Sequence, residues 1–177
     1  AADGAITIAQ DGNKALLLEV NCQTDFVAKD ENFAGFSAQV AAAALAAGET
    51  DAAKIAELKL EDGATVEEAR IALVQKIGEN IQVRRAQIIE GENLAVYKHG
   101  LKIGVVVSYT GDAATGKGIA LDRQMYVIDN DKKVADVLKA TGTTVVQFAR
   151  FEVGEGIEKK AELSFAEEVA AAQAAAK

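Results

Sequence analysis

The sequence predicts an α+β fold with two related subdomains, each with an antiparallel sheet and flanking helices, and a C-terminal helix. Stretches of alternating apolar and polar residues, typical of strands, come in pairs joined by turn residues. Longer stretches with apolar residues every three or four positions, typical of helices, separate these pairs. Strands and helices do not alternate regularly, which disfavours a parallel sheet of strand–helix–strand units.

The first half begins with a predicted hairpin. A strand with alternating isoleucines leads into the turn residues Asp11-Gly12-Asn13, and residues 16–20 return as a more buried strand. Residues 21–32 are polar apart from one large aromatic, Phe26, and are predicted to connect this strand to a helix.

Two helices are predicted next. The first covers about residues 32–47, where apolar side chains recur at helical spacing before a glycine stop. Residues 49–64 are charged and predict a short helix and a loop. The second helix begins at a capping box, in which Thr65 and Glu68 satisfy each other's free backbone N–H groups, and a glycine again follows its last turn.

The remaining elements are mostly strands. One is predicted over residues 81–89, and a second hairpin runs from 94 to 109. A compact helix over about 131–140 precedes a last strand over 145–153. Residues 164–177 are rich in alanine and predict the C-terminal helix.

Two similar segments indicate the domain organisation. Residues 81–92 and 146–156 each contain an arginine-bearing strand, followed by Glu-Gly-Glu in the first segment and Gly-Glu-Gly in the second. We therefore predict one subdomain over 1–92, a second over 93–160 and a helical module over 161–177. Chance similarity between the two segments is the alternative.

Composition narrows the function classes. The chain has 19 Lys and Arg against 27 Asp and Glu, a net charge of −8, and so lacks the excess cations that direct nucleic-acid binding requires. No apolar run reaches the ~18 residues of a membrane span, and no secretory signal pattern opens the sequence, so we expect a cytoplasmic protein without a membrane partner. With one cysteine, Cys22, and one histidine, we expect no disulfide, metal or cofactor.

Two features suggest enzyme chemistry, and in each the residue pattern that the chemistry requires is incomplete. Residues 111–118 approach a phosphate-binding loop, but that motif needs Ser or Thr after its lysine, and Gly118 stands there. We therefore interpret this segment as a glycine-rich connection. The other motif is His99, which lies before Gly100 in a predicted turn, with no serine or cysteine visibly arranged beside it. We expect an exposed histidine that contacts a partner, and no enzymatic activity.

The pair Asp25-Phe26 has two interpretations. A large aromatic beside a carboxylate, on a polar loop after a buried strand, is suited to anchor a protein partner. Alternatively, Phe26 begins the apolar stripe that Phe33 and Phe36 continue, and so belongs to the core. The residues alone favour neither interpretation.

Four blocks of sequence, in the same order, resemble the signatures of the bacterial elongation factor Ts family, the nucleotide-exchange factors of the GTPase elongation factor Tu. Together these blocks mark most of the chain as the core region of that family. They are Asn-Cys-Gln-Thr-Asp-Phe-Val-Ala-Lys at 21–29, Lys-Ile-Gly-Glu-Asn-Ile at 76–81 with Val-Arg-Arg at 83–85, Tyr-Lys-His-Gly at 97–100, and Arg-Phe-Glu-Val-Gly-Glu-Gly-Ile at 150–157.

The resemblance implies a guanine-nucleotide exchange factor that promotes GDP release from elongation factor Tu by disturbing its Mg²⁺ and phosphate site. Asp25 and Phe26 match the residues that reach the GTPase's nucleotide domain, where the phenylalanine enters between two helices. Ile77 matches a contact to the same domain, although it also ends the apolar stripe of its own helix. His99 and Gly100 match a further part of the interface.

The sequence departs from the family in two places. Its first residues match the start of the core, so the family's N-terminal three-helix module is missing, and the central coiled-coil excursion is missing between Ala120 and Leu121. Either these pieces were deleted or the sequence joins separate stretches of a longer chain. The alternative function is therefore a non-catalytic subunit that holds elongation factor Tu in a stable complex. Self-association stays undecided.

Overall fold

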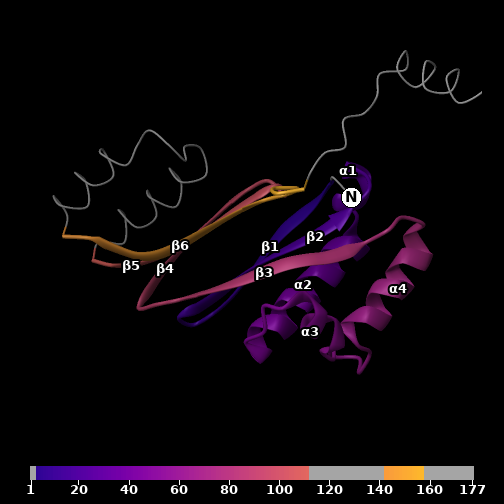
Figure 1. Cartoon of the computed structure of the whole chain (residues 1–177), viewed down its shortest axis with the longest axis horizontal. Coiled ribbons are helices and arrows are strands. Elements are labelled where there is room, and N and C mark those ends of the chain that lie inside the picture. The colour runs from indigo at the N-terminus through magenta and orange to yellow at the C-terminus, as the bar shows by residue number, and fades with distance from the viewer. Residues whose placement is uncertain (1–2, 112–141, 158–177) are drawn as a thin grey trace, which may run out of the picture.

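Two three-stranded antiparallel sheets pack against each other in the computed structural model, and helices cover the outer face of the first sheet (Figure 1). This arrangement confirms the predicted α+β class. The structure describes residues 3–111 and 142–157. Several predicted features lie outside these ranges: the connection over 112–118, the junction at 120/121, the helix over 131–140 and the C-terminal helix.

The first sheet is built on the predicted hairpin. Strands β1 (Asp3–Asp11) and β2 (Lys14–Cys22) pair with each other, and β3 (Gln82–Glu90) pairs with the other side of β2. The central strand β2 is buried on both faces, with Leu16 packed toward the helices and Leu17 toward the second sheet. Burial on both faces explains why its sequence is a continuous apolar run rather than an alternating one.

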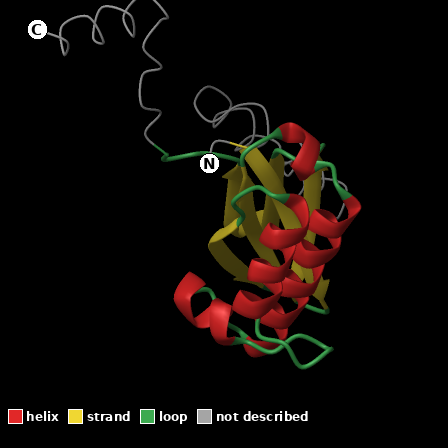
Figure 2. Cartoon of the chain, turned by 90° about the vertical axis from the view of Figure 1, so that its right-hand side faces the viewer, coloured by secondary structure: helices red, strands yellow, loops and turns green. Residues whose placement is uncertain are grey.

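Four helices lie on one face of this sheet (Figure 2). They are α1 (Asp25–Ala28), α2 (Glu31–Ala47), α3 (Ala52–Glu57) and α4 (Val66–Ile77). The three longer helices confirm the predicted ones, whereas the single turn α1 lies where the sequence predicted only a connection. The prediction missed α1 because a four-residue helix is too short to show helical spacing.

The capping box at the start of α4 is present as predicted. The backbone N–H of Thr65 donates to Glu68 Oε2 at 2.8 Å, and the N–H of Glu68 donates to Thr65 Oγ1 at 3.1 Å. These bonds satisfy backbone groups that a helix start otherwise leaves free, and they fix the residue at which α4 begins.

The second sheet contains β4 (Asn93–His99), β5 (Ile103–Thr110) and β6 (Thr144–Glu152), in that order. It packs closely on the first sheet at Gly104, where a Cβ atom would lie only 2.7 Å from a methyl group of Ile6. The buried residues between the sheets are Ile6, Ala15, Leu17, Ile89, Val106, Ala149 and Phe151. The subdomain boundaries at 92/93 and 160/161 stay predictions.

A buried carboxylate joins the two sheets. Glu19 lies on β2, has no exposed surface and accepts four hydrogen bonds. Arg84 Nη1 at 2.8 Å and Arg85 Nε at 2.5 Å donate to its Oε2. Asn21 Nδ2 at 3.0 Å and the backbone N–H of Gly154 at 2.8 Å donate to its Oε1. Because Gly154 follows β6, the carboxylate connects the first sheet directly to the end of the second.

A β-bulge lets two consecutive arginines reach the same carboxylate. The register between β2 and β3 shifts after Glu19, which pairs with Arg85, so that Arg84 is the extra residue on β3. Neighbouring side chains of a regular strand point to opposite faces, and a bulge changes that direction locally. Both guanidinium groups thereby lie beside Glu19.

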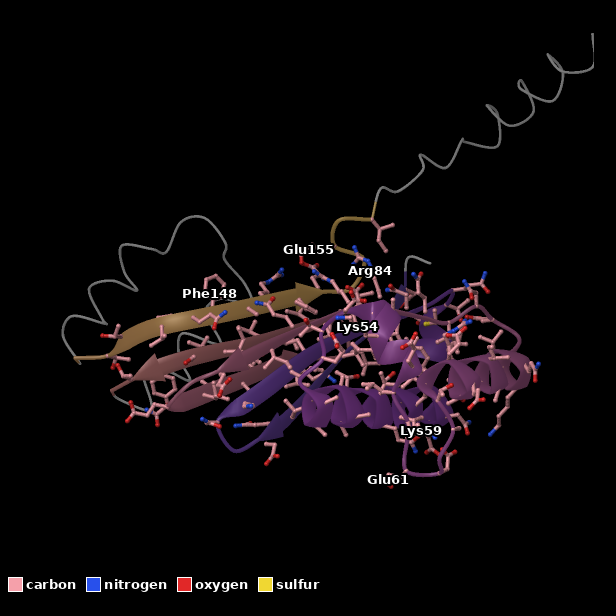
Figure 3. The ribbon with its side chains drawn as sticks, turned by 60° about the horizontal axis from the view of Figure 1, so that its bottom comes forward. Lys54, Lys59, Glu61, Arg84, Phe148 and Glu155 are labelled. Atoms are coloured by element: carbon pink, nitrogen blue, oxygen red, sulfur yellow. The ribbon has the colours of Figure 1, made fainter. Side chains whose placement is uncertain are left out.

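The same two arginines also contact the segment that ends the second sheet. Arg84 donates to the Glu155 carbonyl at 2.5 Å, and Figure 3 shows these two residues together at the end of β6. Arg85 donates to the Glu152 carbonyl at 3.0 Å, and its guanidinium lies 4.1 Å from the ring centroid of Phe151, a cation–π contact. The relative placement of the sheets thus rests on polar contacts as well as on the apolar layer.

Removing the charge of Glu19 is expected to destabilise the fold in a pH-dependent way. Burial by itself raises the pKa of Glu19, but hydrogen bonds from Gly154, Asn21 and Arg85, with the charge of Arg85, bring that pKa below its ordinary 4.5. The ionised carboxylate therefore stabilises the protein fully above the ordinary pKa of 4.5. The stabilisation is lost as the pH falls through the lowered pKa of the folded state.

We expect Glu19→Gln to lower the free energy of unfolding by about 3 kcal/mol at pH 7, because two arginines lose their buried counter-charge. The difference from the unsubstituted chain should shrink as the pH falls below 4.5 and Glu19 itself becomes protonated. Urea unfolding at a series of pH values from 7 downward measures it. Glu61→Gln, on an exposed loop position, is the control and should change stability by less than about 0.5 kcal/mol. A loss that stays the same over the whole pH series would contradict the assignment.

Candidate functional site

Three segments that are distant in sequence meet at the open end of the β1–β2 hairpin. They are residues 23–29, 76–80 and 99–102, and we call their outer face the three-segment surface. Hydrogen bonds join the first segment to the second, and the third is tied to the start of β1. All the predicted site residues belong to this surface: Asp25, Phe26, Ile77, His99 and Gly100.

Phe26 projects into solvent from the first segment. Its side chain is 81% exposed, whereas the neighbouring Val27 and Ala28 are buried and hold α1 on the core. Phe33 and Phe36 belong to the core, so the interpretation of Phe26 as the first residue of their stripe is wrong. A four-residue helix turns each successive side chain by about 100°, which places Phe26 outward when Val27 faces inward.

Asp25 forms an exposed ion pair with Lys29, which lies one helical turn further along the chain. Lys29 Nζ lies 2.9 Å from Asp25 Oδ2. The hydrogen bond from Lys29 and the positive charge of that residue hold the pKa of Asp25 below its usual value, and Asp25 in turn raises the pKa of Lys29. Both groups are therefore charged at neutral pH, and they lie within three residues of Phe26 along the chain.

The second segment is the end of α4. Ile77 is half-buried and packs against the helix-side core, which confirms its core interpretation, and its contact with a partner stays a prediction. Gly78 then takes a left-handed conformation, with φ of 83°, that ends the helix and redirects the chain. Lys76 Nζ donates to Asn32 Oδ1 at 2.7 Å and so fixes the end of α4 against α2.

A set of four hydrogen bonds, which we call the loop clamp, joins the first and second segments. The Glu79 carboxylate accepts from the backbone N–H groups of Gln23 and Thr24, each at 3.1 Å. It also accepts from the Thr24 hydroxyl at 2.7 Å. In return, the Asn80 N–H donates to Gln23 Oε1 at 3.1 Å. The clamp thus fixes the loop before Phe26 to the residues directly after Ile77.

The loop clamp depends on a residue, Glu79, to which the sequence analysis assigns no role. Glu79 and Asn80 follow a helix stop, where polar residues are common, and nothing in their pattern indicates a partner 55 residues away. Only the fold brings the end of α4 beside Thr24, so this role depends on tertiary contacts.

The third segment is the turn between β4 and β5. His99 is exposed, as expected of a turn residue, and Gly100 has a φ of 56° with open space around its Cα. The turn is anchored to β1, because the Leu101 carbonyl accepts from the Ile6 N–H at 2.7 Å and Lys102 forms an ion pair with Asp3. His99 and Gly100 are therefore held at the same end of the molecule as α1.

Cys22 lies beneath this surface. Its buried thiol donates to the Thr24 carbonyl at 3.2 Å. Burial, followed by the negative charges of Asp3 and Glu79, raises the pKa of Cys22 to about 11, and the charge of Lys102 acts in the opposite direction. The thiol thus senses charges from two of the segments and from β1, which shows how closely they gather.

The described part of the chain contains neither a metal-binding group nor a membrane-spanning helix. Within residues 3–111 and 142–157, no group of three His, Cys, Asp or Glu side chains is arranged to hold a metal ion. None of the helices in these ranges is both long and apolar enough to pass through a bilayer.

The chain resembles proteins of one family over most of its length. The family model described as elongation factor TS matches residues 23–122 and 115–155. Elongation factor Ts of Acinetobacter baumannii is 66% identical, over 100% of this chain and 81% of the relative. The protein of the same name from Acinetobacter baylyi is 65% identical over the same shares, and that from a Psychrobacter species is 53% identical over 99% of this chain and 80% of its own length.

The fold and the three-segment surface define a mixed α+β protein with an exposed aromatic on a fixed loop. The sequence matches place it further: this chain belongs to the elongation factor Ts family. The alignments to the relatives run over 235 positions, whereas this chain has 177 residues, so the relatives contain residues within the aligned region that this chain lacks. The two family matches meet at 115–122, around the predicted junction between Ala120 and Leu121.

The geometry predicts an unreactive thiol at Cys22. With its pKa at about 11, only about one thiol in a thousand is ionised at pH 8, and the thiolate is the reactive form. We expect reaction with an aromatic disulfide reagent at pH 8 to be about 100-fold slower in the folded chain than in urea. The chain has one cysteine, so the absorbance change reports this site alone. Equal rates in the two conditions would show that Cys22 is accessible.

Proposed function

We propose that this chain is a guanine-nucleotide exchange factor for elongation factor Tu. The observation that carries the proposal is Phe26, a large apolar ring that is 81% exposed on a loop fixed by the Glu79 clamp. Membership of the elongation factor Ts family supports the choice of partner. An exposed aromatic on a held loop is suited to enter a pocket of a partner protein, where such residues contribute most of the binding energy.

The proposed mechanism is displacement rather than bond chemistry. Phe26 enters between two helices of the GTPase and shifts the segment that organises its Mg²⁺, while Asp25 lies beside the same site. Mg²⁺ bridges and neutralises the nucleotide phosphates, so its displacement weakens the hold on GDP. The chain itself makes and breaks no covalent bond, and so acts without an enzymatic reaction or cofactor of its own.

The other predicted residues extend the contact. Ile77 lies directly before the loop clamp and contributes its outward part to the same nucleotide domain. His99 and Gly100 form a polar edge, on which contacts contribute less than on a buried anchor. We place this activity in the cytoplasm, with no direct nucleic-acid or membrane partner, in keeping with a net charge of −8.

A second candidate function is a non-catalytic subunit that holds elongation factor Tu in a stable complex. One observation favours it: the relatives contain residues within the aligned region that this chain lacks. A chain with fewer contacts would keep the three-segment surface for binding. It would lose some of the contacts that accelerate GDP release. The two functions differ in kinetics, because only an exchange factor accelerates GDP release at substoichiometric amounts.

The proposal predicts that Phe26→Ala lowers the rate of GDP release by about 30-fold, the loss typical of a buried interface anchor. The measurement is release of fluorescent GDP from elongation factor Tu with catalytic amounts of the chain. The melting temperature of the variant should not change, since the ring lies outside the core. His99→Ala should reduce the rate less than Phe26→Ala does.

Ile71→Ala is the matched control, because Ile71 is also an exposed apolar residue but lies on α4 outside the three-segment surface. It should leave the rate unchanged. A stable complex without faster release, detected by gel filtration, would favour the binding subunit. A fall of several degrees in the melting temperature of Phe26→Ala would show that Phe26 stabilises the fold instead.

A further inference from the structure

We propose that Glu79 is a positioning residue that orients Phe26 for its partner through the loop clamp. This inference rests on the proposed function and adds to it a residue that does not touch the partner's nucleotide site. The carboxylate of Glu79 lies at the end of one helix, and the three groups that it binds lie immediately before another. Its effect on exchange would pass entirely through the orientation of α1.

The helix that carries Phe26 needs such an anchor. It has four residues, and an isolated helix of this length is unstable, because helix nucleation fixes several residues for one hydrogen bond. Only Val27 and Ala28 of the helix are buried. These two residues hold the helix on the core, and Thr24 adds a directional anchor at its N-terminus.

Thr24 connects Glu79 to this helix through one oxygen atom. Its Oγ1 accepts from the Val27 N–H at 3.4 Å and donates its proton to Glu79 Oε1 at 2.7 Å. The second distance is the usual one for a hydroxyl that donates to an oxygen acceptor. The donated bond fixes the hydroxyl rotamer that caps α1, and the backbone N–H of Thr24 bonds to the same carboxylate. Thr24 is thus held at two points.

The position of Glu79 is fixed in turn by the end of α4. Gly78 has a φ of 83°, a left-handed conformation that residues with a side chain rarely adopt, and its N–H still donates to the Val74 carbonyl at 2.8 Å. This turn directs the following residue away from the helix axis and toward the loop before α1. The bond from Asn80 N–H to Gln23 closes the clamp on its other side.

A fixed anchor is expected to matter for association. A side chain or loop that is ordered only on binding loses conformational entropy when the complex forms, and this loss is avoided when the free protein already holds the bound geometry. Phe26 has no neighbour in the core to hold it, so its orientation depends on the direction of α1. Glu79 supplies that order before the partner arrives.

Two substitutions distinguish the loss of the clamp's hydrogen bonds from the loss of the negative charge of Glu79. Glu79→Ala removes all three acceptor contacts. Glu79→Gln retains them in another form, because its carbonyl oxygen accepts from both backbone N–H groups while its amide donates to Thr24 Oγ1. That hydroxyl oxygen has two lone pairs and can also accept from the Val27 N–H. The glutamine variant should therefore rescue what alanine loses.

The first experiment is a double-substitution cycle with fluorescent GDP release from elongation factor Tu. Glu79→Ala should raise the concentration of chain that gives half-maximal acceleration by about tenfold, and Glu79→Gln by less than about threefold. If Glu79 acts through Phe26, adding Glu79→Ala to Phe26→Ala should cause no further loss. Glu61→Ala is the control, since Glu61 is exposed on the loop between α3 and α4 (Figure 3).

The second experiment is independent of the partner. Amide hydrogen exchange of Val27, Ala28 and Lys29 in the free chain should be about tenfold faster in Glu79→Ala than in Glu79→Gln, because a lost anchor lets α1 open locally. Exchange in β2 should stay unchanged. This result would support the positioning role even if the unsubstituted chain did not accelerate GDP release, an outcome that would count against the proposed function alone.

Three results would overturn the inference. The first is unchanged exchange of the α1 amides in Glu79→Ala. The second is fully additive losses in the double variant, which would mean that Glu79 contacts the partner or acts elsewhere. The third is equally fast exchange across α1 and β2, which would show that Glu79 stabilises the whole fold rather than orienting one helix.

Discussion

The Glu19 carboxylate lies between the two sheets and accepts hydrogen bonds from both of them. A buried charge is tolerated only when donors surround it, and here a bulge in β3 supplies two arginines while the end of β6 supplies a backbone N–H. Apolar contacts alone would allow the sheets to slide, because they have no direction. The bond from the Gly154 N–H to Glu19, with the bonds from Arg84 and Arg85 to the carbonyls after and at the end of β6, gives the contact between the sheets a direction. The bond from the Ile6 N–H to the Leu101 carbonyl holds the turn at 99–102 at the open end of the first hairpin.

A second carboxylate performs a similar task at the surface. Glu79 joins two segments that are distant in sequence, as Glu19 does, but its partners are a loop and a single helical turn rather than whole sheets. The difference in burial separates their roles. Glu19 is enclosed, so its loss affects the stability of the entire fold, whereas the clamp at Glu79 holds a small element that few apolar contacts secure. A stable core and a separately held anchor for Phe26 can therefore coexist in one small protein.

The local features of this fold were predictable from sequence, and those that depend on distant partners were not. The apolar run of β2 predicted a buried strand, and the Thr65–Glu68 spacing predicted the start of α4, because each signal is contained within a few residues. The direction of Phe26 stayed open, since its spacing suits both the core stripe and an exposed anchor. Glu19 and Glu79 were missed, because a glutamate acquires such a role only when the fold brings donors to it. The family resemblance found the exposed residues of the site but not the residues that hold them.

The location of the loop clamp bears on the choice between the two proposed functions. The four hydrogen bonds of the loop clamp join residues 23–24 to residues 79–80, all within the part of the chain that the structure describes. Contacts that the relatives' additional residues make equally with the loaded and the empty GTPase would strengthen both complexes to the same extent. Linkage relates the weakening of GDP binding to the ratio of those two affinities, not to their size. A chain that lacks such contacts therefore needs a higher concentration to act. Each complex that it does form weakens GDP binding as much as a complex with those contacts would. We therefore favour the proposed exchange function over the binding subunit, because the exposed ring of Phe26 and the loop clamp beside it are both present in this chain.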